Sequence, residues 1–345
     1  METAHAESAP RSLWVRLRRA LEQRPLLVLV VPACVAFAAV VWLGETARIR
    51  GVDDVVRHVD PFWLAVCLGG ELLAYAGYVL ALRDTARVDE GPRLSFRLST
   101  TTVVAGFGVF AATRASGGFG VDYWALRRAG ANRESAIARV LALGALEYVV
   151  LAPAAMFSAL VLIASGDHRL SLGLTLPWLL VIPGALAAAW LAAPRRACRI
   201  LSWRDGGRLR QGFAHAVSGL SIVRSLLTSP REYGLGLAGT AAYWVGDIAC
   251  LWAALQVFGD PGLSLPALIL AYATGYVLTR RSLPLGGAGI VEIALTFALH
   301  WVGVPLGRAL VGVVIYRLFN LWLPILPALA VLPSIKRLRR EFETA

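Results

Sequence analysis

The chain has 345 residues; 57% are hydrophobic, only 16% are charged, and the formal net charge is +12. Soluble domains carry roughly 25% charged residues, so this composition excludes a soluble globular protein and indicates an integral membrane protein. The basic excess does not indicate a nucleic-acid partner, because the arginines cluster at the ends of apolar segments, where membrane topology accounts for them. The four cysteines form no C-x-x-C pair and the five histidines are scattered, so we expect neither a metal site nor a cofactor.

The apolar segments predict membrane-spanning helices. Residues 26–43 and 170–193 contain no charge, and each is long enough for the ~20 residues that cross a bilayer. Residues 61–82, 233–259 and 309–335 are similarly apolar, with one charged residue each. We therefore expect an all-α integral membrane protein, a polytopic helical bundle of about 7–9 membrane segments.

The distribution of arginine predicts the orientation of the chain. Cytoplasmic segments of membrane proteins are enriched in Lys and Arg. We therefore expect a transmembrane domain over residues 25–335, with both termini in the cytoplasm. The basic segments assigned to the cytoplasm are 1–24, 83–97, 195–233 and 336–345.

Two glycine-rich segments interrupt the apolar chain at 116–120 and 285–289. The segments that follow, 121–130 and 290–304, are too short to span a bilayer at 1.5 Å per residue. We interpret both as short or re-entrant helices. Glycines that only allow close packing between ordinary helices are the alternative.

The predicted orientation gives these two regions opposite directions. Residues 98–165 run from the cytoplasm to the outside, whereas 263–335 run from the outside to the cytoplasm. Repeat one, about 61–165, and repeat two, about 234–335, are therefore predicted to be inverted-topology repeats, as in many transporters.

Charged residues inside the predicted spans are costly, about 2.5–3.5 kcal/mol each on insertion scales, and are therefore paired or functional. For Glu71, Arg139, Glu147 and Asp247 we favour intramembrane charge pairing. Glu147 and Arg317 occupy comparable places in the two repeats, so a pair between the halves is one alternative.

The glycine breaks predict a headgroup site at the membrane midplane. Free N–H groups at helix N-termini and guanidinium groups suit phosphate. In the alternative interpretation, Asp122 and Glu292 only cap the short helices. The predicted substrate-binding residues are Arg114, Asp122, Arg280, Arg281, Gly286, Gly287, Gly289, Glu292 and Arg317.

The C-terminal part carries a family pattern. It reads P-L-G-G-A-G-I-V-E over 284–292, then G-V-P over 303–305, I-Y-R-L over 315–318 and W-L-P over 322–324. This pattern resembles the lysylphosphatidylglycerol synthase transmembrane family. The first glycine break departs from the family's glycine-glutamate-arginine form, since it carries Asp122.

The resemblance implies a flippase-like multi-pass protein of the bacterial inner membrane, with Glu292 and Arg317 as motif positions. We expect it to bind an anionic phospholipid or related headgroup and to move it between leaflets. The alternative is a non-transporting partner that presents lipid to a separate synthase or transferase. The chain ends at Ala345 without an aminoacyl-transferase domain, so no enzyme activity is expected. The segment 195–233 is expected to bind the anionic inner leaflet.

Overall fold

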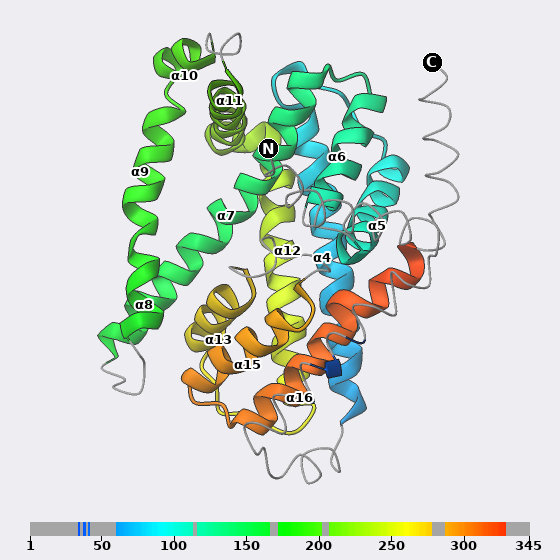
Figure 1. Cartoon of the computed structure of the whole chain (residues 1–345), viewed down its shortest axis with the longest axis vertical. Helices are drawn as coiled ribbons and strands as arrows, with labels where there is room; N and C mark the ends of the chain where they lie inside the picture. Colours follow the sequence, from blue (N-terminus) through cyan, green and yellow to red (C-terminus); the bar gives the residue numbers. More distant parts are fainter. Residues whose placement is uncertain are drawn as a thin grey trace, which may run out of the picture.

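The computed structural model describes residues 60–112, 116–165, 172–201, 207–277 and 287–328, with four isolated positions between 34 and 41. Every regular element in these ranges is a helix, and no strand occurs there (Figure 1). The predicted all-α membrane fold is thus confirmed. Four of the predicted binding residues lie outside the described residues: Arg114, Arg280, Arg281 and Gly286.

Four described helices are long and apolar enough to cross a membrane. They are α4 (Pro61–Arg87, extended by η1, Val88–Glu90), α7 (Arg133–Ala164), α12 (Pro230–Gln256), and α16 (Leu306–Arg317) continued by η5 (Leu318–Trp322) to Ala328.

The helices α8 (Leu172–Leu179), α9 (Val181–Leu191) and α10 (Pro194–Leu201) are long and apolar enough for a fifth span only when α10 is counted with the other two, and the chain bends by 73° before α10. The described ranges thus supply four or five spans, and the predicted total of about 7–9 is not confirmed. The predicted span 26–43 falls almost entirely outside these ranges.

The helices α4 and α12 form a tightly packed antiparallel pair at the centre of the bundle (Figure 1). Gly70 lies against Gly246, and Gly77 lies against Gly239. A Cβ added at any of these four positions would lie less than 3.0 Å from a backbone oxygen of the other helix. The two backbones therefore touch without side chains between them, as small residues allow in membranes.

The same pair reveals the internal symmetry. Each helix has 27 residues and begins with proline, and Pro230 follows Pro61 by 169 residues (230 minus 61). The same interval separates Gly70 from Gly239, and also Gly77 from Gly246. Each glycine consequently packs against the counterpart of the other one. This exchange across an antiparallel pair is the arrangement that an inverted-topology repeat requires.

Shorter helices complete the two halves. The first contains α5 (Phe96–Ala112) and α6 (Ser116–Arg128), and the second contains α13 (Leu265–Tyr272), the π-helical turn η3 (Ala273–Val277) and α15 (Ile290–Trp301). At ~1.5 Å per residue, α6 and α15 reach about 20 Å, less than a ~30 Å hydrocarbon layer. The segments that follow both glycine regions therefore lie in short helices, as predicted.

The two glycine regions differ in conformation. The first is already helical from Ser116, so its glycines lie within α6. The second contains Gly287 and Gly289, with φ angles of 71° and 88°. Residues other than glycine rarely adopt such φ angles. Of the two regions, the second therefore shows a break that depends on glycine.

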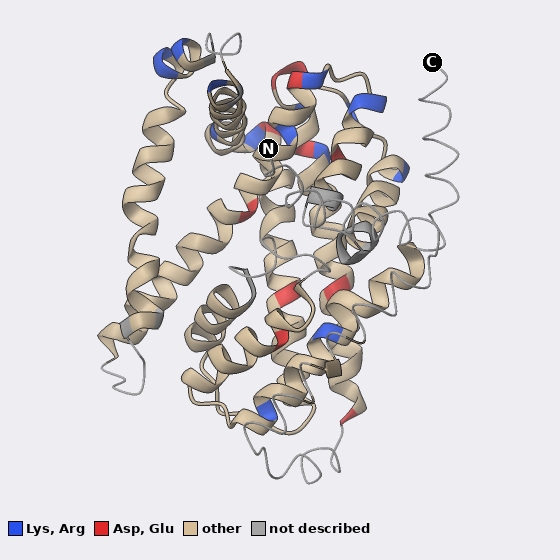
Figure 2. Ribbon diagram, in the orientation of Figure 1, with Lys and Arg blue, Asp and Glu red and all other residues tan. Residues whose placement is uncertain are grey.

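Charged residues gather at one end of the bundle, where α6, α10 and α11 (Arg208–Thr228) lie, while few occur among the helices below (Figure 2). We call this the basic end. It includes the exposed arginines Arg128, Arg133, Arg195, Arg199 and Arg210.

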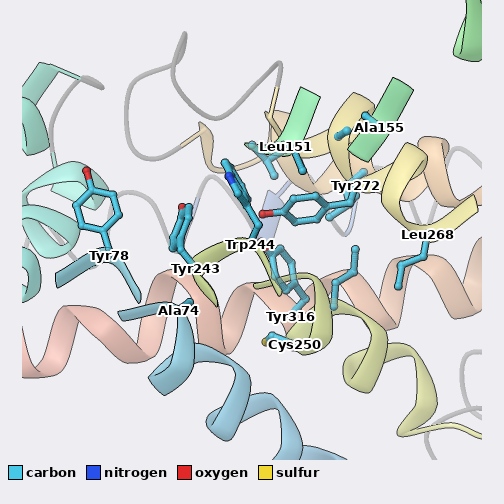
Figure 3. Packing of buried hydrophobic residues seen from close by; sticks show 14 of the residues in the cluster. Ala74, Tyr78, Leu151, Ala155, Tyr243, Trp244, Cys250, Leu268, Tyr272 and Tyr316 are labelled. Carbon is cyan, nitrogen blue, oxygen red and sulfur yellow. The ribbon is translucent and has the colours of Figure 1, made fainter. Parts of the chain in front are cut away.

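The core contains a series of aromatic rings that crosses the bundle (Figure 3). Tyr78 meets Tyr243 edge to face at 5.5 Å, and Tyr243 lies beside Trp244 at 4.6 Å. Trp244 meets Tyr272 at 6.0 Å, and Tyr272 meets Tyr316 at 6.4 Å, all between ring centroids. Such contacts add to the burial energy of the rings. The series ends at the two tyrosines that hold a buried aspartate.

Candidate functional site

Asp247 is completely buried in α12 and accepts hydrogen bonds from three side chains of the second half. The Tyr316 hydroxyl donates to Oδ1 at 2.9 Å, and Asn320 Nδ2 donates to the same oxygen at 2.9 Å. The Tyr272 hydroxyl donates to Oδ2. A carboxylate can accept about four hydrogen bonds, so these donors supply most of what Asp247 needs away from water.

Glu292 and Arg317 form a buried ion pair beside this network. Arg317 Nε donates to Glu292 Oε1 at 2.8 Å, and the exposed fractions of the two side chains are 1% and 3%. The backbone N–H of Gly289 donates to the other oxygen, Oε2, at 2.6 Å. Glu292 therefore both caps the start of α15 and orients the guanidinium group of Arg317.

Two successive residues of α16 join the network and the ion pair. Tyr316 contacts Asp247, while Arg317 contacts Glu292. We call the whole group the polar cluster: Asp247, Tyr272, Glu292, Tyr316, Arg317 and Asn320. Its members come from α12, α13, α15, α16 and η5, so every described helix of the second half contributes except the π-helical turn η3.

The polar cluster is flanked by two π-helical turns. One, η3, begins directly after Tyr272, and the other, η5, begins directly after Arg317 and contains Asn320. Single π-helical turns are rare and occur frequently at functional sites. The regular α-helix is therefore interrupted beside Tyr272 and at Asn320, two of the residues that donate hydrogen bonds to Asp247.

The described part of the polar cluster holds more negative than positive charge. It contains two carboxylates, those of Asp247 and Glu292, and one guanidinium group, that of Arg317. The buried Glu71 lies next to Gly70, which packs against Gly246, so it is at the level of Asp247 in the α4–α12 pair. At this depth the described carboxylates of Asp247, Glu292 and Glu71 therefore outnumber the described guanidinium group of Arg317.

The remaining predicted residues lie in the first half. Asp122 is buried on α6. Glu147 is buried on α7, and its backbone oxygen accepts a hydrogen bond of 2.8 Å from Trp244 Nε1. The ion pair recorded for Arg317 is with Glu292 of its own half, and the pair considered with Glu147 stays a prediction.

Arg139 has a structural role at the basic end. Its Nε and a terminal nitrogen donate to the backbone oxygens of Ala86 and Val88, and the other terminal nitrogen contacts Ser135. These oxygens belong to the end of α4, where carbonyl groups lack helical partners. Arg139 thus caps a helix C-terminus, and its predicted charge pairing stays a prediction.

Sequence reasoning missed three members of the polar cluster: Tyr272, Tyr316 and Asn320. It searched the spans for charges, and these residues are neutral. One signal was available, because Tyr316 and Asn320 are polar, flank Arg317 and are four residues apart, which places them on one face of a helix. In the described ranges, no group of three His, Cys, Asp or Glu residues could hold a metal ion.

No curated protein matches the chain. The family model described as the lysylphosphatidylglycerol synthase TM region matches residues 27–328, which include both halves and the whole polar cluster. Together with its membrane-spanning helices, this match shows a multi-pass membrane protein that belongs to the lysylphosphatidylglycerol synthase transmembrane-region family.

Proposed function

We propose that this protein binds a lipid headgroup at the polar cluster and moves the lipid between the two leaflets. The observation that carries the proposal is the Glu292–Arg317 pair, buried in the bundle at a glycine break. Ionised residues inside membrane helices are costly, and they commonly mark substrate pathways. A pair placed where α15 begins supplies both a charge and a helix N-terminus to a ligand.

The depth of the cluster supports a midplane site. Nine residues separate Asp247 from the end of α12 at Gln256, about 14 Å along the helix axis. Half of a ~30 Å hydrocarbon layer is about 15 Å. Asp247 and its partners would therefore lie about half a hydrocarbon layer from the end of α12 at Gln256.

The charges of the polar cluster favour a headgroup that carries both a phosphate and a cationic group. The planar guanidinium of Arg317 matches a phosphate, which would compete with Glu292 for it. Asp247, with Glu71 at the same level, would meet a cationic part of the same headgroup. Glu292 neutralises Arg317 until a phosphate takes its place.

The second candidate is a membrane partner that presents lipid to a separate synthase or transferase. The exposed arginines of α10 and α11 favour it, because a basic surface suits an acidic soluble partner. The same arginines also suit the anionic inner leaflet. This candidate predicts copurification of a soluble enzyme through α10 and α11, and no transport without it.

The test is phospholipid scrambling in liposomes that contain the purified protein. Arg317→Ala and Glu292→Ala should each abolish transport of a fluorescent phospholipid. Arg308→Ala is the matched control on α16, because Arg308 contacts the loop oxygens of Phe258 and Asp260, away from the polar cluster. Unchanged transport in both Arg317→Ala and Glu292→Ala would contradict the proposed site.

A charge swap separates a ligand site from a structural lock. The double variant Glu292→Arg/Arg317→Glu keeps a buried ion pair but reverses its direction and removes the cap on Gly289. If the pair only holds the helices together, the swap should restore transport relative to the single variants. If it binds a headgroup, transport should stay lost although the protein is folded, as judged by its gel-filtration profile.

A further inference from the structure

An apolar groove of about 480 Å³ lies between the short helix α6 and the long helix α7. Its lining includes Phe119, Gly120 and Tyr123 of α6 and Leu141, Gly144 and Tyr148 of α7. The glycines contribute no side chain, which makes the surface concave between the aromatic rings. The groove belongs to the first half and contains no residue of the polar cluster, so it is a separate feature of the molecule.

The groove opens on the outer surface of a membrane span. Leu141 and Tyr148 are 42% and 38% exposed, and both lie on α7, which is long and apolar enough to cross the bilayer. At such a position the surrounding medium is lipid, and an apolar concave surface there selects hydrocarbon chains over polar ligands.

The length of the groove matches one leaflet. From Ile137 to Tyr148 its α7 wall covers twelve residues, a rise of about 16 Å along the helix. The hydrocarbon part of one leaflet is about 15 Å deep. A single acyl chain can therefore lie in the groove over most of the depth of one leaflet.

Positive charge stands at one mouth of the groove. Arg133 lies four residues before Ile137, about one helical turn, and it is exposed at the start of α7. Arg128, also exposed, ends α6, and its guanidinium group lies over the Trp124 ring, 5.9 Å from the ring centroid. A lipid whose chain fills the groove would have its phosphate within reach of these two guanidinium groups.

We infer that the α6–α7 groove binds one acyl chain of an anionic phospholipid, with its phosphate held by Arg128 and Arg133. The inference rests on the proposed function only in naming this lipid as the substrate; binding in the groove can be measured without transport. The groove would hold the lipid in the leaflet at the basic end, before the headgroup moves to the polar cluster.

The experiment uses the full-length protein in liposomes with phosphatidylglycerol that carries a photoreactive diazirine in one acyl chain. After illumination, adducts are mapped by mass spectrometry. Leu141 and Leu160 form a matched pair, because both lie on α7 and each is 42% exposed, but only Leu141 lines the groove. We expect several-fold more adduct at Leu141. Equal labelling would overturn the inference, since ordinary surrounding lipid labels by exposure alone.

Filling the groove provides the second arm. A Cβ at Gly120 meets nothing within 4 Å, so Gly120→Leu should fold and occupy the groove. Gly69→Leu is the matched control, because Gly69 is another exposed helical glycine with open space, on α4. The first variant should lower Leu141 labelling to the level of Leu160, and the second should not. Ala145→Phe fills the groove from the α7 side and should act like Gly120→Leu.

The headgroup is tested with Arg128→Gln/Arg133→Gln. This double variant should reduce labelling by the phosphatidylglycerol probe and leave labelling by a phosphatidylcholine probe unchanged. Equal loss with both probes, or with neither, would overturn the anionic assignment. Scrambling is measured in the same liposomes. If the native protein labels Leu141 but moves no lipid, the proposed function fails and the groove stands; the converse result refutes the groove alone.

Discussion

Gly77 of α4 and Gly239 of α12 contact each other reciprocally, so that a Cβ added to either would lie less than 3.0 Å from the backbone oxygen of the other. Gly70 and Gly246 make the same reciprocal contact seven residues away along the two helices. The two halves of the molecule therefore meet backbone to backbone at their centre. Any movement of one half against the other, as lipid transport requires, involves this contact or takes place around it.

The first prediction concerns this contact. Gly77→Ala should destabilise the protein by about 1–3 kcal/mol, because the added methyl group meets backbone atoms of α12 that cannot move aside. Gly69→Ala on the same helix should be neutral or slightly stabilising, since its Cβ meets nothing within 4 Å. Thermal unfolding in detergent measures both. Equal melting temperatures would mean that the helices can separate without cost.

Much of the fold could be predicted from the sequence because a bilayer imposes simple requirements. Spans appear as apolar runs and their orientation follows from arginine, so α4, α12 and α16 were expected near their observed places. The symmetry was visible in the 169-residue interval between glycine segments. The helical state of the first glycine region was not visible, because Gly117 and Gly120 are compatible with either a helix or a break.

The candidate site was only partly visible. Glu292 and Arg317 stood out because charges are rare in apolar spans, and they do form an ion pair. Their partners could not be predicted in the same way. Tyr272 is one of nine tyrosines, and nothing in its neighbourhood indicates that it reaches Asp247, since that contact depends on how α13 packs against α12. The capping role of Arg139 could not be predicted for a similar reason: its acceptors are backbone oxygens, which every sequence contains.

The second prediction concerns Asp247. Asp247→Ala should leave the donors of Tyr272, Tyr316 and Asn320 buried without their acceptor, at about 1–3 kcal/mol for each unsatisfied group. Asp247→Asn keeps one oxygen and should lose less stability. The melting temperatures of the variants, measured by intrinsic fluorescence during heating, give their order of stability. If the alanine variant were as stable as the asparagine variant, the three hydrogen bonds would not hold the second half together.

The third prediction separates a structural arginine from a functional one. Arg139→Gln should lower stability by about 1–3 kcal/mol, because the oxygen of Ala86 loses the Arg139 donor and the oxygen of Val88 keeps only the N–H of Gly91. Scrambling per folded molecule should stay near the native level, in contrast to Arg317→Ala. Arg133→Gln, at the exposed start of α7, is the stability control. Loss of transport by Arg139→Gln at full stability would place Arg139 in the lipid pathway instead.

The fourth prediction is the orientation of the bundle. The basic end should face the cytoplasm, since it gathers the exposed arginines of α6, α7, α10 and α11. In a background with the exposed Cys34 and Cys198 replaced by alanine, the buried Cys67 and Cys250 should stay unlabelled. An impermeant maleimide should then label Ser264→Cys in intact cells, because this exposed residue precedes α13 at the opposite end.

Arg210→Cys on α11 should be labelled only after the cells are permeabilised, because it lies at the basic end. The two cysteines thus act as mutual controls for leakage and for access. The reverse pattern would invert the assignment of the leaflets. The α6–α7 groove would then take its lipid from the outer leaflet, and transport would run through the polar cluster from the opposite side.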